Sequence, residues 1–391
     1  MEKLWKYKKI GEVCIVERGA SPRPIDKYIT DNESGINWIK IGDTSDSMYI
    51  TETAQKIIVE GMKKSRYVKP GDFLLSNSMS FGRPYILKID GCIHDGWLVL
   101  RDENALFDKR FLYYYLSSKT TYKKLKSMAV GGVVNNLNSE MVRNVIVPVP
   151  DKEEQSEIAD LFDKIKKILD DRKQELEQLD TLVKSRFVEL FGDPVINSRG
   201  WKKALIGDDC FVTKLAGFEY TQYINYEDSG DVVMVKAQNV KNRKLNRKEL
   251  SFISNEVSDS LPRSQLAPGD VVMTYVGANI GDVAIIDNEY KYHLAPNVAK
   301  IRPDSERYNS IYFMYMLMLL NAYIVKNSAD TAKAALGMER IRKLNVFVPP
   351  MELQNQFADF VTSIDKSKSK IQKSLEETQL LFDSLMQKYF G

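Results

Sequence analysis

The second half of this chain repeats the first at an offset of 196 to 199 residues, and no other feature of the sequence constrains the fold as strongly. The matching segments are Trp5-Lys6 with Trp201-Lys202, Ile10-Gly11 with Ile206-Gly207, Pro70-Gly71-Asp72 with Pro268-Gly269-Asp270, His94 with His293, and Phe191-Gly192 with Phe390-Gly391. Similarity at a nearly fixed spacing indicates that one folding unit is built twice. At 391 residues the chain is long enough for two such units, each with its own core.

Each copy contains a mixed segment followed by a helical one. The mixed segments span residues 1–150 and 196–349, and the helical segments span residues 151–195 and 350–391. Within the mixed segments, short β-rich runs follow the Pro-Gly-Asp turns, and one unbroken aromatic and aliphatic run per copy predicts a buried helix. The sequence therefore predicts the α+β class, with two similar domains joined by long helices.

The helical segments carry apolar residues at the alternating spacing of three and four that is typical of a coiled-coil seam. Eight of the ten seam positions are apolar in each segment, starting from Ile158 and Phe162 in the first and from Phe357 and Val361 in the second. Neither run contains glycine or proline, so each is expected to form one helix of about 40 residues and about 60 Å. The two helices are predicted to pair with each other as an antiparallel coiled coil.

Composition excludes several classes of protein. Hydrophobic residues make up 43% of the chain and charged residues 28%, which is typical of a globular protein and not of a disordered one. No apolar run approaches the roughly 20 residues that span a bilayer, and the N-terminus lacks the apolar stretch of a signal peptide, so we expect a cytoplasmic protein. Three cysteines without a CxxC pair exclude a disulfide framework and a cysteine-ligated zinc site. The net charge of +3 is too small by itself to indicate a nucleic-acid partner.

The sequence also lacks the common catalytic motifs. It contains no GxxxxGKS or GxxxxGKT phosphate loop, no GxGxxG turn, no GxSxG elbow and no HExxH zinc motif. The segment Val348-Pro349-Pro350-Met351 lacks the asparagine and the aromatic residue of the clamp that holds a flipped base in adenine methyltransferases. Pro150-Asp151 with Asp171-Arg172-Lys173 has the form of a nuclease motif, but its second part falls inside a predicted helix. The two histidines, His94 and His293, repeat without a cluster of cysteines or carboxylates, which favours structural roles over a metal site.

The tandem of two variable modules, each followed by a similar long helix, resembles the specificity subunit of Type I restriction-modification enzymes. The resemblance covers the whole chain and is most specific at the module ends. There, Val145 to Pro150 precedes Glu154-Gln155, and Val346 to Pro350 precedes Gln354. The second copy departs from the family pattern by having Leu353 in place of the glutamate.

This resemblance implies that each module is a target-recognition domain that reads one half of a split, asymmetric site in double-stranded DNA. The helices would act as spacers that set the distance between the half-sites and dock methyltransferase subunits, two of them by analogy. Restriction subunits would also join. S-adenosylmethionine, ATP and Mg²⁺ would be held by these partners, so that this chain binds no cofactor or metal and catalyses nothing. The assembled complex would be an adenine-specific DNA methyltransferase and an ATP-dependent site-specific endonuclease, without a membrane partner.

Residues that could contact DNA are expected in the loops of both modules. Lysine, arginine and hydroxyl side chains contact phosphates, whereas arginine, asparagine and glutamine read base edges. The candidates in the first module are Arg18, Ser21, Arg23, Ser76, Asn77, Ser78, Ser80, Arg83, Asn135 and Asn136. Those in the second are Gln222, Tyr223, Lys236, Gln238, Asn239, Lys241, Arg243, Thr274, Tyr275, Asn279 and Lys333.

Two other interpretations remain open from the residues alone. The chain could be a coiled-coil adaptor with two peptide-binding modules and no DNA partner, although the cations between Lys241 and Lys248, without an acid among them, speak against this. An intact nuclease or methyltransferase is disfavoured by the missing motifs. Binding of duplex DNA with a steep negative salt dependence would distinguish the DNA-reading hypothesis from the adaptor.

Overall fold

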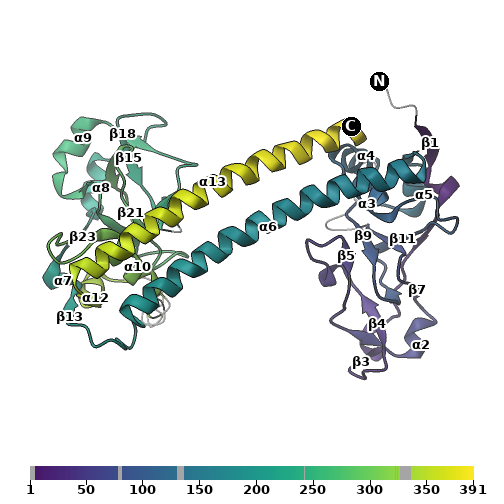
Figure 1. Cartoon of the computed structure of the whole chain (residues 1–391), viewed down its shortest axis with the longest axis horizontal. Coiled ribbons are helices and arrows are strands. Elements are labelled where there is room, and N and C mark those ends of the chain that lie inside the picture. Colours follow the sequence, from purple (N-terminus) through teal and green to yellow (C-terminus); the bar gives the residue numbers. More distant parts are fainter. Residues whose placement is uncertain are drawn as a thin grey trace. The chain divides into compact units, whose positions relative to one another are not determined.

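The computed structural model describes residues 5–77, 82–129, 136–241, 243–321, 323, 325 and 336–391. It divides into two compact units, which are Met1–Lys173 with Lys373–Gly391 (unit 1) and Gln174–Gln372 (unit 2). The divisions fall inside two helices of 40 residues, α6 (Lys152–Phe191) and α13 (Met351–Phe390). Each unit therefore contains one mixed domain and one part of each long helix (Figure 1).

Unit 1 is built around two five-stranded sheets, in the orders β3-β6-β4-β10-β7 and β2-β11-β8-β9-β5, and β1 pairs with β12. Its strands are β1 (Lys6–Lys9), β2 (Ile15–Arg18), β3 (Ile29–Thr30), β4 (Ile36–Ile39), β5 (Tyr49–Ile50), β6 (Lys56–Ile57), β7 (Arg66–Val68), β8 (Phe73–Ser76), β9 (Pro84–Leu87), β10 (Gly91–Ile93), β11 (Trp97–Arg101) and β12 (Ile146–Val149). Its short helices are α1 (Ile10–Val13), α2 (Val59–Met62), α3 (Lys109–Ser117), α4 (Lys119–Ala129) and α5 (Ser139–Arg143), with 3-10 turns η1 (Ile25–Lys27) and η2 (Ile41–Asp43).

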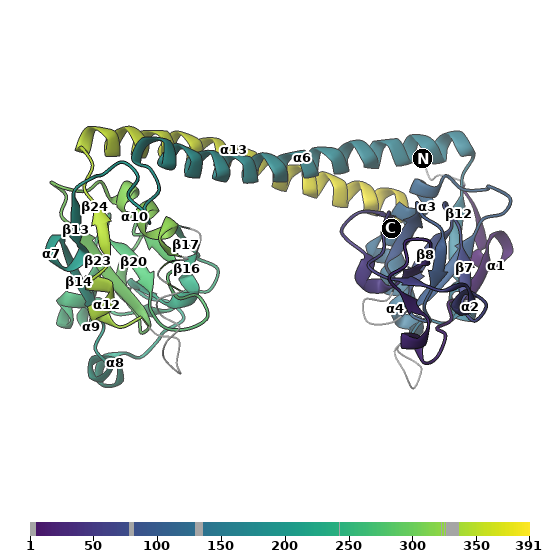
Figure 2. The same cartoon turned by 90° about the horizontal axis from the view of Figure 1, so that it is seen from below.

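Unit 2 has two four-stranded sheets, in the orders β14-β23-β20-β21 and β18-β15-β22-β19, and two short pairs, β13-β24 and β16-β17. Its strands are β13 (Lys203–Leu205), β14 (Cys210–Lys214), β15 (Val232–Val235), β16 (Val240–Lys241), β17 (Lys244–Leu245), β18 (Phe252–Ile253), β19 (Gln265–Leu266), β20 (Val271–Thr274), β21 (Val283–Ile285), β22 (Lys291–Leu294), β23 (Val298–Pro303) and β24 (Asn345–Phe347). Its short helices are α7 (Ile206–Asp209), α8 (Gly217–Tyr223), α9 (Asn255–Ser260), α10 (Ser310–Leu319) and α12 (Met338–Arg342), with η3 (Ala237–Asn239) and η4 (Pro262–Ser264). The sheets of unit 2 lie to one side of its helix segments (Figure 2).

The turns predicted from Pro-Gly-Asp form in both units for the same reason. Gly71 and Gly269 adopt φ of +90° and +89°, a backbone conformation that glycine tolerates without a steric penalty. The aspartate that follows accepts a hydrogen bond from a backbone N–H three residues earlier, at 3.0 Å for Asp72 and 2.8 Å for Asp270. Each turn then leads into a fully buried strand, β8 or β20.

A buried glutamine joins each domain to its long helix. The Oε1 atom of Gln155 accepts from the backbone N–H of Asp108, the N-cap of α3, at 2.7 Å, and its Nε2 donates to the carbonyl of Pro150 at 2.9 Å. Gln354 makes the same two contacts with Asn309, the N-cap of α10, at 2.9 Å and with Pro349 at 2.8 Å. Because each glutamine side chain bridges a domain helix and the loop before the long helix, it fixes the direction in which that long helix leaves the domain.

The long helices run antiparallel within each unit. In unit 1, Phe162 of α6 packs on Phe382 and Phe390 near the end of α13, with ring centroids 5.4 and 5.6 Å apart. In unit 2, Phe187 near the end of α6 packs on Phe357 near the start of α13, at 5.4 Å. These aromatic residues belong to the largest hydrophobic core of their unit, together with residues of α3 or α10. The predicted α+β class with paired long helices is confirmed.

Candidate nucleic-acid interface

Asp95 organises the predicted contact residues of unit 1. It follows β10, and its carboxylate accepts a hydrogen bond from the Ser21 hydroxyl at 2.8 Å and pairs with the guanidinium of Arg23 at 3.2 Å. Its backbone carbonyl accepts from Arg18 Nε at 3.1 Å and from Asn77 Nδ2 at 2.8 Å. Four residues from two separate stretches of sequence therefore converge on one aspartate.

The carboxylate at the centre of this cluster is held in its ionised form. Partial burial by itself raises the pKa of Asp95, but the hydrogen bonds from Ser21, its own backbone and Arg23, together with neighbouring His94, outweigh burial and leave the pKa below its usual value. The Arg23 side chain is 81% exposed, so its positive charge faces solvent next to a fixed negative charge. The cluster can present both a cation and an acceptor to a ligand.

The loop after β8 is anchored by residues that are themselves buried. Ser76 and Asn77 are 1% and 0% exposed. The Ser76 hydroxyl accepts from the backbone N–H of Arg83 at 3.0 Å, and the Ser76 carbonyl accepts from Gly82 at 2.7 Å. The Asn77 carbonyl accepts a hydrogen bond from the backbone N–H of Leu137 at 3.0 Å. These side chains position the loop and are not placed to contact a large ligand directly.

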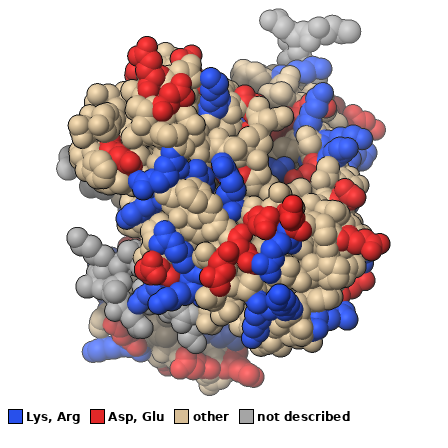
Figure 3. Space-filling view, turned by 90° about the vertical axis from the view of Figure 1, so that its left-hand side faces the viewer, with Lys and Arg blue, Asp and Glu red and all other residues tan. Residues whose placement is uncertain are grey.

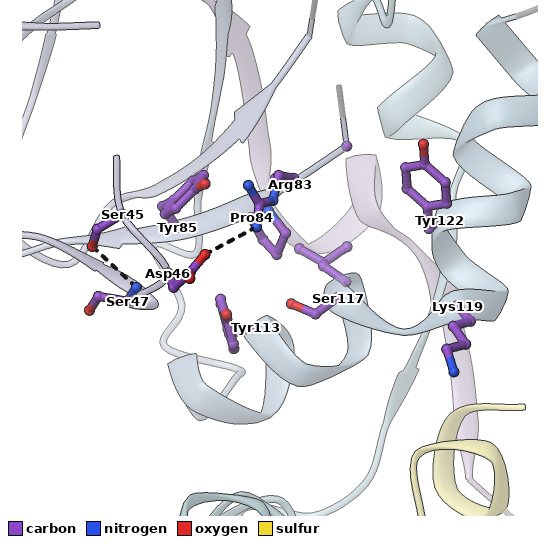
Figure 4. A pocket seen from close by; sticks show the side chains of 12 residues that line it. Ser45, Asp46, Ser47, Arg83, Pro84, Tyr85, Tyr113, Ser117, Lys119 and Tyr122 are labelled. Carbon is purple, nitrogen blue, oxygen red and sulfur yellow. Dashed lines mark hydrogen bonds and ion pairs between the residues drawn. The ribbon is translucent and has the colours of Figure 1, made fainter. Parts of the chain in front are cut away.

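Arg83 emerges from that loop into solvent. Its guanidinium lies 3.9 Å from the Asp46 carboxylate at the rim of a cavity of about 450 Å³ that Tyr85, Tyr113 and Ser117 also line (Figure 4). The side chains of Arg83 and Asp46 are 56% and 99% exposed, so this pair is weak and the arginine can exchange it for another anion.

Some predicted contacts cannot be placed. Ser78, Ser80, Asn135 and Lys333 lie outside the described residues. Asn136 is half-buried and immediately precedes Leu137, whose N–H binds the Asn77 carbonyl, so the structure brings these two predicted loops together. The same bond recurs in unit 2, where the N–H of Leu336 donates to the carbonyl of Tyr275 at 2.8 Å.

The candidates in unit 2 fall into exposed and buried groups. Gln222 and Tyr223 are exposed on α8, Gln238 is exposed in η3, and Asn279 is exposed in the loop after β20. Tyr275 is half-buried, with the Lys214 ammonium 5.4 Å from its ring centroid. Lys236 is half-buried and donates to the Ser251 hydroxyl at 2.8 Å, and Asn239 and Thr274 are buried.

Ion pairs within unit 2 occupy most of the basic run between Lys241 and Lys248. Arg243 binds Asp180 of α6 at 2.6 Å, and Lys244 binds Asp365 of α13 at 3.0 Å. Arg247 pairs with two carboxylates that follow β21, Asp287 and Glu289. Lys241 and Lys248 are exposed and no ion pair to either is present among the described residues. Acidic and basic side chains are correspondingly interspersed on the face seen in Figure 3. Because carboxylates neutralise three of its five cations, the surface formed by this run is much less positive than the sequence alone suggests.

His293 is buried and His94 is half-buried, and both rings lie next to backbone groups. The ring nitrogens of His94 face the N–H groups of Ile41 and Gly96 at 3.2 and 2.9 Å. Those of His293 face the carbonyls of Leu294 and Leu261 at 3.0 and 3.3 Å. Burial lowers the pKa of both imidazoles.

Within the described part of the chain, no three Cys, His, Asp or Glu side chains lie together as they would to hold a metal ion. No described helix has the length and apolar character to cross a bilayer.

Sequence reasoning missed Asp95 and an aromatic cluster in unit 2. Phe218 of α8 is 67% exposed, and Tyr220 of the same helix lies 6.0 Å from Tyr226, over which the Lys236 ammonium sits at 5.5 Å. Comparing the two copies could have found Asp95, because it directly follows the repeated histidine, whereas unit 2 has Leu294 at that place. The two units thus share a framework and present different chemical groups on it.

Comparison with known families gives a match to both copies of the repeat. A family model described as the Type I restriction modification DNA specificity domain matches residues 2–179 and 199–378. The Type I restriction enzyme MjaVIII specificity subunit of Methanocaldococcus jannaschii is 23% identical over 95% of this chain and 90% of its own length. The MjaIX specificity subunit of the same organism is 22% identical over 99% of this chain and 92% of its own length.

Solved structures show the same fold. A chain from a type I R-M system, in a structure that addresses its complex assembly and conformational transition, superposes with a TM-score of 0.64 at 17% identity, over 99% of this chain and 97% of that one. The S subunit of a Type-I restriction-modification system from M. genitalium superposes with a TM-score of 0.57 at 14% identity, over 99% and 96% of the two chains.

Proposed function

The chain belongs to the family of Type I restriction modification DNA specificity domains, and from this premise we propose that its two mixed domains, residues 1–150 and 196–349, each read one half of a split site in double-stranded DNA. As a specificity subunit it recognises DNA within a restriction-modification complex, and the catalytic steps belong to partner subunits.

The observation that supports two different half-sites is the contrast between a repeated framework and unrepeated surface groups. The glutamine contacts at Gln155 and Gln354 are the same in both units, as is the bond from the N–H of Leu137 or Leu336 to the preceding loop. By contrast, the ionised Asp95 cluster has an apolar counterpart at Leu294. Since identical frameworks hold different donors and acceptors, the two domains select different bases and the site is asymmetric.

The contact residues that we favour are those that the structure leaves exposed. In the first domain they are Arg23 and Arg83. Asp95 holds the side chain of Arg23, Ser76 holds the backbone of Arg83, and the buried Asn77 binds the carbonyl of Asp95. In the second they are Gln222, Tyr223, Gln238, Lys241 and Asn279. Phosphate contacts by the cations would set affinity and register, and the amides and arginines would read base edges.

The long helices complete the proposal as spacers and docking elements for methyltransferase subunits, two of them in the assembly, with restriction subunits joining that core. S-adenosylmethionine, ATP and Mg²⁺ would be held by those partners. Carboxylates of both long helices pair with domain cations, as Asp163 of α6 does with Arg110 and Asp365 of α13 does with Lys244, and these pairs support a fixed geometry between each domain and its helix segments.

Selection of bound duplexes from a random library tests this function. The full chain is assembled with its methyltransferase subunits and the bound DNA is sequenced at two salt concentrations. We expect enrichment of two short sequences separated by a spacer without preference, and an affinity that falls steeply as salt increases. Enrichment of no sequence, with binding that salt does not affect, would support the adaptor interpretation instead.

A further inference from the structure

Helix α8 carries an aromatic side chain that the core of unit 2 does not use. Phe218 is 67% exposed and belongs to none of the hydrophobic clusters formed by the described residues. Gln222 lies one turn further along the same face, and its side chain makes no hydrogen bond with any described residue. This face of α8 therefore presents one aromatic ring and one side-chain amide to solvent.

The opposite face of α8 attaches the helix to the domain. Glu219 accepts a hydrogen bond from the backbone N–H of Ala216 at 2.9 Å and pairs with Arg263 at 3.2 Å. Tyr220 packs against the core of the domain, and Ile224, at the end of the helix, is buried. Within unit 2, α8 lies at the end of the domain opposite the long helices (Figure 2). The exposed face is thus held in a fixed orientation, away from the helix segments.

The internal repeat places α8 at the position of the loop in unit 1 that carries Arg23. Before this stretch, Cys14 matches Cys210 at an offset of 196. After it, Lys40 matches Lys236 at the same offset. The two stretches therefore have equal length, and α8 stands where unit 1 has the predicted contact residues that converge on one aspartate.

The two stretches present different chemical groups. The backbone N–H of Tyr220 donates to the carbonyl of Ala216 at 3.0 Å, whereas the matching residue of unit 1 is Pro24, which has no N–H and cannot make this helical bond. Phe218 has the buried Pro22 as its counterpart. At this place unit 1 exposes the guanidinium of Arg23, and unit 2 exposes an apolar ring on a helix.

The surface around this ring suits the edge of a base better than a protein partner. One aromatic side chain offers about 150 to 250 Å² of contact area, whereas a stable protein contact buries about 800 Å² on each partner. Exposed Lys214 precedes the helix, and Arg263 lies beside it with about half of its side chain exposed. The loop after α8 contains Glu227, Asp228 and Asp231, which repel phosphates. The contact of α8 itself is therefore assigned to base edges and not to the DNA backbone.

We propose that α8 reads an A·T base pair in the half-site of unit 2, with Gln222 binding the adenine and the Phe218 ring packing on the thymine methyl group. In the major groove, which admits an α-helix, glutamine pairs with N6 and N7 of adenine and phenylalanine contacts the C5-methyl group of thymine. Side chains four residues apart have Cβ atoms about 5 to 6 Å apart, so the two can reach one base pair or two adjacent pairs about 3.4 Å apart. The inference rests on the proposed function and adds Phe218 as a specificity-determining residue.

Replacement of thymine by uracil tests the methyl contact, because uracil keeps the base pair and removes only the C5-methyl group. The duplex that the assembled complex selects from the random library is resynthesised with deoxyuridine in place of each thymine in turn, and the affinity of the complex is measured for each duplex. We expect affinity to fall about threefold to fivefold at one thymine of the half-site read by unit 2, which is the effect of one buried methyl group.

Variants of the helix connect that response to the two side chains. Phe218→Ala should bind the thymine and uracil duplexes equally well, and Phe218→Leu should restore part of the difference. Gln222→Ala should weaken the preference for adenine in this half-site by about tenfold or more, which also identifies the half-site that unit 2 reads. Tyr7→Ala removes an aromatic side chain of unit 1 that is 61% exposed, and this control should keep the response to uracil.

Failure of this inference and failure of the proposed function give different results. If a split site is selected but no uracil substitution in that half-site lowers affinity, or if Phe218→Ala still responds to uracil as the parent does, the proposal is overturned and the proposed function stands. Failure to select any sequence would overturn both.

Two other roles for the ring are separated by the same variants. Insertion of the ring between base pairs predicts that Phe218→Ala weakens DNA binding while uracil has no effect on the parent. A protein contact predicts that Phe218→Ala weakens binding of the purified methyltransferase subunit to the full-length chain without DNA. Either result contradicts the proposal.

Discussion

At the scale of single residues, Asp95 is an acid at the centre of the surface that we propose contacts DNA. Its carboxylate repels phosphate, yet it fixes Ser21 and Arg23 and, through its carbonyl, Arg18 and Asn77. Because the Asp95 carboxylate holds Ser21 and Arg23 in place and repels phosphates that approach elsewhere, it favours a single arrangement of the bound DNA. Asp95 is therefore a positioning residue for the first domain.

Replacement of Asp95 by asparagine keeps the shape and removes the charge. We expect Arg23 to become available for a phosphate, so the slope of log affinity against log salt should become steeper by about 0.9, the value for one added contact. Preference at the first half-site should relax and the second half-site should stay as it is. Asp383→Asn, which removes an exposed ion pair with Lys119 in the same unit, is the control and should leave slope and sequence preference unchanged.

Lys300 provides a second test at this scale, through the pH dependence of folding. It is 2% exposed in β23, donates to the carbonyls of Arg263 and Gln265 at 2.7 Å each, and burial lowers its pKa from 10.5 to about 8. Between about pH 8 and pH 10.5 the unfolded chain holds this proton and the folded chain has released it, so this lysine makes the free energy of unfolding rise as the pH rises.

The Lys300→Met variant should lack that rise. The difference in unfolding free energy between parent and variant should grow by about 1 to 3 kcal/mol across this window, since each pH unit is worth about 1.4 kcal/mol. Urea unfolding of both proteins at pH 8 and pH 10.5 measures it. A constant difference at the two pH values would show that Lys300 stays protonated in the folded domain.

At the scale of elements, the β16-β17 hairpin acts as a clamp between the second domain and its helices. Arg243 is only 12% exposed at its side chain and adopts φ of +71°, a conformation that residues other than glycine rarely use. The cost of that backbone is offset by the contact with Asp180 and by packing over Tyr315. The hairpin is thus a structural element more than a reading element.

Arg243→Ala should consequently lower the stability of unit 2 by about 1 to 3 kcal/mol, with little change in which DNA sequence is chosen. Hydrogen exchange of α10 and of the adjoining part of α6 reports the loss, and that of unit 1 should not change. Lys241→Ala, two residues away and exposed, is the matched comparison. It should leave exchange unchanged and weaken binding to all duplexes to a similar extent, as loss of a phosphate contact does.

The same hairpin shows where sequence-based prediction succeeds and where it fails. The spacing of apolar residues from Ile158 onward predicts a long helix because the information is local, and the Pro-Gly-Asp turns are local too. Arg243 is held by Asp180, which lies 63 positions away in the sequence. The charges next to Arg243 in the sequence do not reveal this contact and wrongly predict a solvent-exposed arginine. Ser76 and Asn77 have the composition of contact residues, but their burial depends on β11 and on the segment before α5, which no local pattern reveals.

At the scale of the whole molecule, the repeat places two reading domains on one pair of continuous helices. Lengthening both helices by one heptad, near Leu176 and near its counterpart Leu375, keeps the apolar seam because the seam recurs every seven residues. Each helix becomes about 10.5 Å longer. If the helices set the spacing, the preferred spacer in DNA should grow by up to about three base pairs, at about 3.4 Å each, and the half-sites should not change.

Sequencing of duplexes selected by the parent and by the lengthened variant measures the spacer. An insertion of two residues at the same two places is the control, because it turns the following seam by about 200° and should impair folding or subunit binding. An active heptad variant that still prefers the original spacer would show that something other than helix length determines the spacing.

The length of the long helices makes the orientation that the buried glutamines impose on them important. A rod of about 60 Å moves at its far end by about 1 Å for each degree of rotation at its base. Gln155 and Gln354 lie where the long helices begin. A small change in the angle of a helix at its glutamine therefore becomes a large displacement at the far end of that helix. A loose fit at this point would spread the positions of the residues farther along the helix. Hydrogen bonds to both the oxygen and the nitrogen of each side-chain amide restrict that motion where the helix begins.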